Sequence, residues 1–139
     1  YRGADILGAL ETMRAFPGDP HRGRGVEFVN PLTHEHPFPT FAYGAQLLRG
    51  GESSRSFRHT ASTLFCELAG HGYTEVNGKR FEWGPNDVFV VPNSLWHHHV
   101  NASLGEDAVL YSVSDRPLVE KIGQYFAQGR TADNAVVAL

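Results

Sequence analysis

Short extended segments separated by turn residues fill the middle of this chain, and this alternation constrains the fold more than any other feature. We expect eight such segments, at residues 40–48, 54–59, 63–69, 72–76, 79–83, 87–91, 96–101 and 108–114. Fifteen glycines and eight prolines supply the turns that so many short strands need. Asn77-Gly78 joins two segments and accepts the positive φ angles of a tight type I′ hairpin. The pattern predicts an all-β fold, either a closed barrel or a double sheet.

The flanking segments have a different character. Residues 5–16 place apolar side chains at helical spacing and end at Pro17-Gly18, which predicts a short amphipathic helix. Residues 117–128 also have helical spacing, and Ser114-Asp115 is placed to cap that helix. The stretch between the first helix and the strands is rich in Gly, Pro and His and resembles an arm, with one short extended piece at 26–30. The expected organisation is a helix and arm at 1–39, a barrel at 40–116, and a helix and tail at 117–139.

Composition narrows the function classes. Twelve Lys and Arg against fifteen Asp and Glu give a net charge of -3, and the basic residues are scattered, so we expect neither nucleic acid nor an anionic membrane as a partner. No apolar run approaches the roughly 18 to 20 residues of a membrane span. Cys66 is alone and lies in a predicted core strand, so we expect a small buried hydrophobe rather than a nucleophile. Without a second Cys or a visible secretion leader, the expected location is the cytoplasm.

Eight histidines invite a metal hypothesis, because neutral imidazole is a common transition-metal ligand. In a strand, alternate side chains face opposite ways, so only His97 and His99 of the His97-His98-His99 run can share a face. The His34-Glu35-His36 run lies among prolines and is expected in a surface loop. His21 and His71 stand beside glycines in turn-like contexts, and no role is assigned to either.

His59 belongs to a longer pattern. The pattern has a first part with Gly51, His59 and Gly70 and a second part with Gly84, Pro92, His97 and Asn101. It resembles the two-part motif of the cupins, and this resemblance implies a double-stranded β-helix, or jelly-roll, barrel.

The first part departs from the cupin pattern at two ligand positions. Phe57 stands where the motif has its first His, and Thr63 stands where it has Glu. Only His59 and His97 keep the ligand type that the resemblance implies, whereas a catalytic iron or zinc site normally has three protein ligands. We therefore expect a degenerate metal site, with His99 as the candidate third donor. The expected pocket residues are Phe57, Thr63, Trp96 and Arg58.

A narrower resemblance rests on residues 87–99 and 106–117, with support from Phe28-Val29-Asn30-Pro31 and Arg58-His59-Thr60. These stretches look like the C-terminal cupin of gentisate 1,2-dioxygenases and their salicylate and hydroxynaphthoate relatives. The resemblance implies a parent enzyme with two cupins that uses ferrous iron and dioxygen to open an aromatic ring, as in aromatic compound catabolism. The iron of that family usually sits in the N-terminal cupin, which has no counterpart among these residues.

The resemblance therefore implies a non-catalytic domain that promotes assembly, with no catalytic residue of its own. Its expected partners are the catalytic N-terminal cupin of the same polypeptide or of neighbouring subunits in a homo-oligomer, and the enzyme's substrate is a small aromatic carboxylate.

Two alternatives remain open. The chain could be a stand-alone cupin that binds a small carboxylate, with Arg55, Arg58 or His59 as the anion partner. It could also be a minimal metal-dependent dioxygenase that uses His59, His97 and a third donor.

Overall fold

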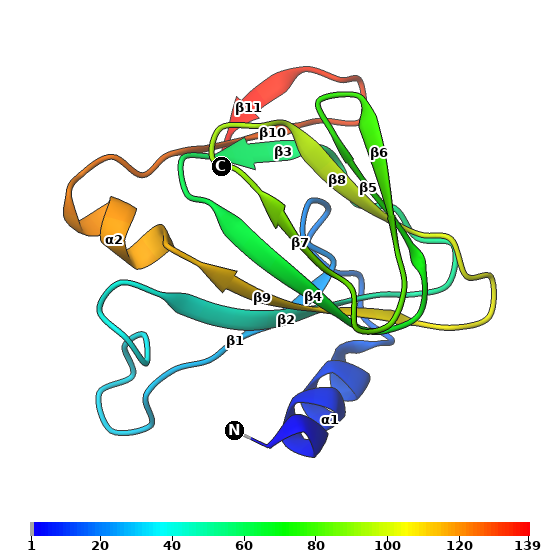
Figure 1. Ribbon diagram of the computed structural model, residues 1–139, viewed down its shortest axis with the longest axis horizontal. Helices are drawn as coiled ribbons and strands as arrows, with labels where there is room; N and C mark the ends of the chain where they lie inside the picture. The colour runs from blue at the N-terminus through cyan, green and yellow to red at the C-terminus, as the bar shows by residue number, and fades with distance from the viewer. Residues whose placement is uncertain (1) are drawn as a thin grey trace.

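Two antiparallel β-sheets face one another in the computed structural model, which describes residues 2–139 (Figure 1). One short helix precedes the first strand and another follows the ninth. The all-β expectation with short flanking helices is confirmed. The elements are α1 (Gly3–Met13), β1 (Arg24–Glu27), β2 (Ala42–Leu48), β3 (Phe57–His59), β4 (Thr63–Ala69), β5 (Gly72–Val76), β6 (Lys79–Trp83), β7 (Val88–Val91), β8 (His97–Asn101), β9 (Ala108–Ser114), α2 (Arg116–Lys121), β10 (Ala127–Arg130) and β11 (Val136–Ala138).

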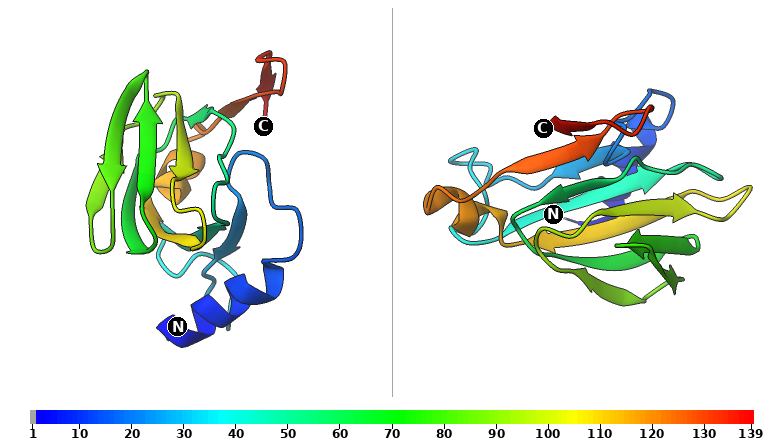
Figure 2. Two further views of the ribbon diagram at one scale, coloured as in Figure 1. Left: turned by 90° about the vertical axis from the view of Figure 1, so that its right-hand side faces the viewer. Right: turned by 90° about the horizontal axis from the view of Figure 1, so that it is seen from above.

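The chain passes back and forth between the two sheets as it winds. One sheet has the order β1-β2-β9-β4-β7, and the other has the order β11-β10-β3-β8-β5-β6. From β2 to β10 the path changes sheet at every connection except the β5–β6 hairpin, so each sheet is built from strands distant in sequence. Figure 2 shows the resulting sandwich, with α1 lying outside it. This is the double-sheet barrel that the strand pattern predicts.

Strand alternation decides which side chains fill the space between the sheets. Along β4, Thr63, Phe65 and Glu67 are buried, whereas Leu64 and Leu68 face outward and are exposed. The same rule brings six apolar side chains into one cluster inside the barrel. These are Leu48, Phe65, Trp83, Val91, Ala108 and Leu110.

The helix α1 covers part of the outer face of the five-stranded sheet. Leu10 is fully buried there and packs with Ala45, Leu47 and Val109, which point away from the barrel interior. The segment after the helix is tied down by Arg24, which is 3% exposed and forms an ion pair with Glu52 at 2.7 Å. Burial opposes ionisation of Glu52, but hydrogen bonds from Arg24 and Arg49 outweigh it and lower the pKa of this carboxyl to about 2.

The C-terminal region differs from the sequence prediction. The helix expected over residues 117–128 ends at Lys121, and Gly123 follows with a φ of 69°. Residues 127–130 instead form β10, which pairs with β3, and the predicted tail contributes β11. Asp115 stands at the N-cap of α2 but makes no side-chain capping bond, because its carboxylate accepts the N–H of Ser62. Tertiary pairing therefore overrides the helical spacing of Tyr125 and the residues around it.

Two further local predictions have different outcomes. Asn77 and Gly78 both have positive φ angles, 47° and 80°, which confirms the expected tight hairpin between β5 and β6. The prediction that Cys66 is buried is wrong. Cys66 lies on the outward face of β4 beside Tyr111 and is half-buried, because the inward positions of this strand belong to its neighbours on either side. None of the helices described in residues 2–139 has the length and apolar character of a membrane span.

Candidate functional site

A cavity of about 350 Å³ opens between the two sheets, on the side where β1, β2 and β3 meet the start of β4. Polar and aromatic side chains line it together. They include Arg22, Gln46, Phe57, His59, Thr63, Phe65, Ser112, Ser114, Arg116 and Tyr125. The volume lies near the lower end of the range typical for small-molecule sites. The sequence-predicted residues Phe57, His59 and Thr63 are thus brought to one cavity.

Phe57 and His59 reach this cavity because they alternate with the outward-facing Arg58 along β3. The Phe57 ring stacks on the His59 ring, with centroids 5.6 Å apart and planes 9° apart. Burial, together with charge repulsion from His97, Arg22 and Arg116, lowers the pKa of His59 to about 4. His59 is therefore neutral at pH 7, and its buried Nδ1 has no hydrogen-bond partner in the described chain.

His97 lies on β8 and is 2% exposed. Its Nδ1–H donates to the Leu95 carbonyl at 3.0 Å, so Nε2 carries a lone pair, and this atom is buried without a partner in the described chain. Burial lowers the pKa of His97 to about 4. The Phe57 ring packs against the His97 ring with centroids 4.3 Å apart, and His97 does not line the cavity. Phe57 thus covers the second of the two candidate ligands.

His99, the candidate third donor, is fully buried and packs elsewhere. Thr74 Oγ1 accepts the Trp83 Nε1–H at 2.9 Å and contacts His99 Nδ1 at 2.7 Å. This contact ties His99 to the same hydroxyl that accepts from Trp83. The ring also meets Phe65 edge to face at 4.7 Å. His99 is held in the packed interior by Thr74 and Phe65.

The residues present do not fit a three-ligand iron site. The His59 and His97 ring centroids are 6.2 Å apart, and a phenyl ring lies against both imidazoles. In residues 2–139, no three or more His, Cys, Asp or Glu side chains are grouped so that they could hold a metal ion. What the cavity does offer is hydrogen-bonding groups and charges of both signs, from Arg22 and Arg116 and from Asp19 and Glu27.

The remaining expected pocket residues lie in different places. Thr63, the first residue of β4, is buried and lines the cavity. Trp96 does not line it, because its indole is stacked between the guanidinium groups of Arg58 at 4.8 Å and Arg130 at 4.5 Å. Arg58 also donates two hydrogen bonds to Gln128 Oε1. Trp96 and Arg58 therefore form a separate stack outside the cavity.

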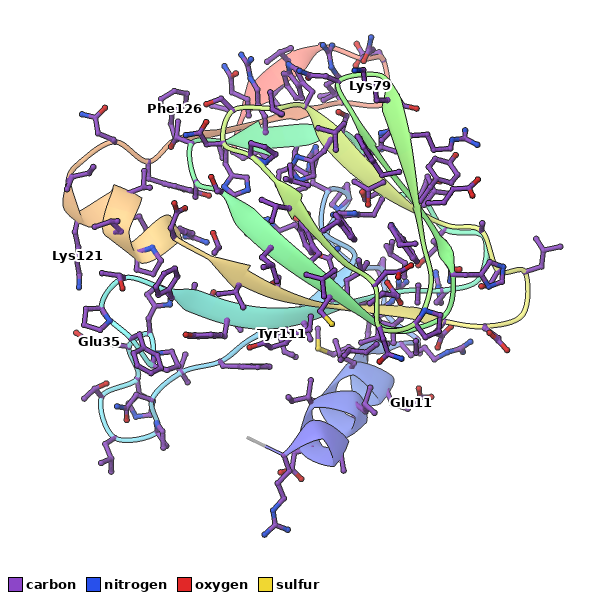
Figure 3. The ribbon with its side chains drawn as sticks, in the orientation of Figure 1. Glu11, Glu35, Lys79, Tyr111, Lys121 and Phe126 are labelled. Atoms are coloured by element: carbon purple, nitrogen blue, oxygen red, sulfur yellow. The ribbon has the colours of Figure 1, made fainter. Side chains whose placement is uncertain are left out.

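Three further histidines, His21, His34 and His36, lie outside the candidate ligand set. The loop that carries His34 and His36 projects from the sandwich beside Glu35 (Figure 3), as the surrounding prolines predict. His36 contacts Glu27 at 3.1 Å. His21 is buried, its Nε2 lies 3.1 Å from the Arg130 carbonyl, and its ring meets Phe57 edge to face. The turn-like sequence around His21 gave no indication that its side chain is buried.

Among the cavity residues that sequence reasoning missed are Arg22, Gln46, Arg116 and Tyr125. They come from the arm, β2, the start of α2 and the segment before β10, so only the folded chain brings them together. Strand alternation places Gln46 on the face of β2 opposite to Ala45 and Leu47. Because Ala45 and Leu47 pack under α1, Gln46 faces the cavity.

The fold is a jelly-roll barrel whose cavity is lined by His59, with His97 packed against Phe57 beside it. Residues 45–114 match the model of the family described as the cupin domain, which is half of the chain. The chain therefore belongs to the cupin family, and the resemblance drawn from its two-part motif is confirmed.

Within the cupin family, the chain is similar in sequence to ring-cleaving dioxygenases. It is 43% identical over 134 residues to a 5-aminosalicylate 1,2-dioxygenase of a Comamonas species, covering 95% of this chain and 35% of that protein. It is 36% identical over 108 residues to a gentisate 1,2-dioxygenase of a Haloferax species, covering 77% of this chain and 29% of that protein. The chain thus spans about a third of the length of these relatives.

A solved structure supports the fold over nearly the whole chain. The salicylate 1,2-dioxygenase of Pseudaminobacter salicylatoxidans superposes with a TM-score of 0.84 at 24% identity, covering 93% of this chain and 38% of that one. At this identity the match shows the shared barrel. It agrees with the double-sheet topology described above.

Proposed function

We propose that this chain is the non-catalytic, assembly-promoting C-terminal cupin of a ring-cleaving dioxygenase of the gentisate 1,2-dioxygenase type. The packing of Phe57 carries the proposal. Its ring lies 4.3 Å from the His97 ring and stacks on the His59 ring, so the first ligand position of the cupin motif is filled by a side chain that cannot bind a metal. The relatives named above, of which the chain spans about a third, support a parent enzyme with a further catalytic part.

The chemistry of ring cleavage explains why this barrel is assigned a structural role. Ferrous iron held by three protein ligands keeps open positions for substrate and dioxygen. His59 and His97 alone offer two, and Thr63 stands where the motif has a carboxylate. We therefore assign the iron and the small aromatic carboxylate substrate of the parent enzyme to its other cupin.

An assembly role is supported by the outer face of the five-stranded sheet. Leu64 and Leu68 on β4 and Val88 and Val90 on β7 are exposed there, at 37% to 59% of their surface. Strand β7 is also an edge of this sheet and is free to pair. A contiguous apolar face next to an open edge favours packing on a partner cupin of the same polypeptide or of a neighbouring subunit in a homo-oligomer.

One observation favours a second candidate, a minimal dioxygenase centred on His59 and His97. His97 donates its Nδ1–H to a backbone carbonyl and keeps Nε2 free, which is how metal-ligating histidines are usually oriented. Iron, if bound there, would supply the site for dioxygen. His97 would have to be uncovered by movement of Phe57 before it could act as a ligand.

Oxygen uptake separates the two candidates. The 139-residue chain is supplied anaerobically with ferrous iron, then mixed with gentisate or salicylate in aerated buffer in an oxygen electrode. The Haloferax gentisate 1,2-dioxygenase, treated in the same way, is the positive control. The proposal predicts a flat trace from a protein whose circular dichroism shows a folded β domain. Uptake that depends on substrate and is abolished in His97→Ala would contradict it and establish the minimal dioxygenase.

A further inference from the structure

We propose that the 350 Å³ cavity binds a small aromatic carboxylate without a metal, with Arg22 and Arg116 facing the carboxylate and the phenyl ring of Phe57 beneath the aromatic part. This site goes beyond the assembly role and does not depend on it. It includes three positions of the cupin ligand motif, Phe57, His59 and Thr63, whereas His97 does not line it.

Arg22 is the first anion partner because its positive charge is unmatched. Its guanidinium lies over the Phe57 ring at 5.7 Å, which places it at the cavity. In residues 2–139 this side chain forms no ion pair and no hydrogen bond; only its backbone N–H is engaged, by Asp19. A guanidinium presents a planar set of donors that matches a carboxylate, so an unpaired one beside a cavity favours an anionic ligand.

Arg116 provides a second cation from the other side of the cavity. Its Nε donates to Glu120 at 2.6 Å, and its guanidinium stacks on the Tyr125 ring at 4.9 Å. These two contacts fix its orientation and leave the terminal nitrogens of the guanidinium without hydrogen-bond partners in the described chain. Arg22 and Arg116 both lie close enough to His59 to lower the pKa of its imidazole, so both charges act on the same space.

Two buried nitrogen atoms at the cavity also lack partners. Gln46 Nε2 and His59 Nδ1 are both buried, and neither makes a hydrogen bond within residues 2–139. Buried polar atoms are nearly always paired, so two unpaired ones on the two facing sheets indicate that a bound molecule completes them. A ring hydroxyl or a second carboxylate oxygen matches this chemistry.

The rest of the lining favours the aromatic part of a ligand, and its two carboxylates have partners of their own. Phe57, Phe65 and Tyr125 contribute ring surfaces, and Thr63 adds a hydroxyl. The two acidic residues at the cavity are already engaged. Asp19 accepts the backbone N–H groups of His21 and Arg22, and Glu27 contacts His36 at 3.1 Å.

The test uses a matched pair of probes, benzoate and its uncharged isostere benzamide. Isothermal titration calorimetry measures both on the 139-residue chain in buffer with EDTA and without phosphate. Arg22→Gln removes the unpaired charge at an exposed position, where folding is expected to be unaffected. Arg55→Gln is the matched control, because Arg55 is also exposed but does not line the cavity.

We expect benzoate to bind in EDTA and benzamide to bind about tenfold more weakly or not at all. Arg22→Gln should weaken benzoate by about tenfold, whereas Arg55→Gln should leave the affinity unchanged. Gln46→Leu, tested as a second variant, should weaken benzoate without unfolding the protein. No binding of benzoate at millimolar concentration, equal binding of the two probes, equal effects of the two arginine variants, or binding that requires added iron would each overturn the proposal.

Discussion

On the packed side of the barrel, the buried amide of Asn101 makes three hydrogen bonds, whereas on the cavity side the buried amide nitrogen of Gln46 makes none within the described chain. We call the region around Thr74, Trp83 and Asn101 the packed half, and the region lined by Gln46 and the other cavity residues the cavity half. Both lie between the same two sheets. The polar side-chain atoms of Thr74, Trp83 and Asn101 in the packed half have partners, whereas Gln46 Nε2 and His59 Nδ1 in the cavity half have none in the described chain.

This difference indicates where the fold is stabilised and where it is available for binding. Asn101 connects β8 to the end of β2 through the Leu48 carbonyl and to the loop before β9 through the Glu106 carbonyl. The cavity half contains no comparable connection through Gln46 or His59. Removal of a polar side chain should therefore lower the free energy of unfolding strongly in the packed half and only slightly in the cavity half.

The largest expected effect is that of Asn101→Ala. The substitution leaves the Leu48 and Glu106 carbonyls and the Ser103 N–H buried without their partner, and each such group costs roughly 1 to 3 kcal/mol. We expect the free energy of unfolding, measured by urea denaturation, to fall by about 4 kcal/mol. Asn93→Ala, at an exposed position, is the control and should change it by less than about 0.5 kcal/mol. A loss of less than about 1 kcal/mol in Asn101→Ala would contradict the comparison.

Glu67 and His99 are exceptions in the packed half, because each has a buried atom without a partner in the described chain, and Glu67 gives the next effect. It is fully buried, its Oε2 has no partner in the described chain, and burial raises the pKa of this carboxyl from 4.5 to about 7. Because the folded pKa lies above the unfolded one, the protein loses stability as the pH rises from 4.5 to about 7. At about 1.4 kcal/mol for each pKa unit, the loss reaches about 3 kcal/mol above pH 7.

Glu67→Gln should remove this pH dependence. The free energy of unfolding of the variant and of the unsubstituted protein is measured in urea at pH 5 and at pH 8. The difference between the two proteins should favour the variant by about 3 kcal/mol more at pH 8 than at pH 5. Glu82→Gln, at an exposed position on β6, controls for the change in net charge. The same difference between the two pH values in both variants would show that Glu67 is not the group responsible.

The cavity half should give the smallest effect. Gln46→Met replaces an amide nitrogen that has no partner in the described chain with an apolar group of similar length. The free energy of unfolding should rise slightly, by less than about 1 kcal/mol. Thermal or urea unfolding measures this directly. A loss as large as that of Asn101→Ala would show that the two halves do not differ as described.

Much of the barrel could be predicted from sequence because strand alternation and turn chemistry act locally. Thr63, Phe65 and Glu67 of β4 face inward as alternation requires, and the Asn77-Gly78 hairpin forms as predicted. The helix predicted over residues 117–128 included the first two residues of β10, and no strand was predicted at 127–130 because Ala-Gln-Gly-Arg carries no strand signal of its own. They form β10 only because β3 offers a partner, and no local pattern contains that information.

The site was partly predictable for the same reason. His59 and Phe57 were placed together by the two-residue period of β3, which the motif also follows. Arg22 and Arg116 are 94 residues apart and meet at the cavity only in the folded chain, so no spacing rule connects them. Cys66 shows the limit of alternation, because a segment of mixed apolar residues does not reveal which face is inside.

Bound iron per chain tests the central claim most directly, since the account rests on Phe57 and Thr63 replacing two ligands at the histidine site. The chain is purified without chelator, incubated anaerobically with ferrous iron, desalted and measured by elemental analysis. The account predicts iron far below one atom per chain, unchanged in His97→Ala. A content near one atom per chain that His97→Ala abolishes would contradict it and make this barrel a metal site.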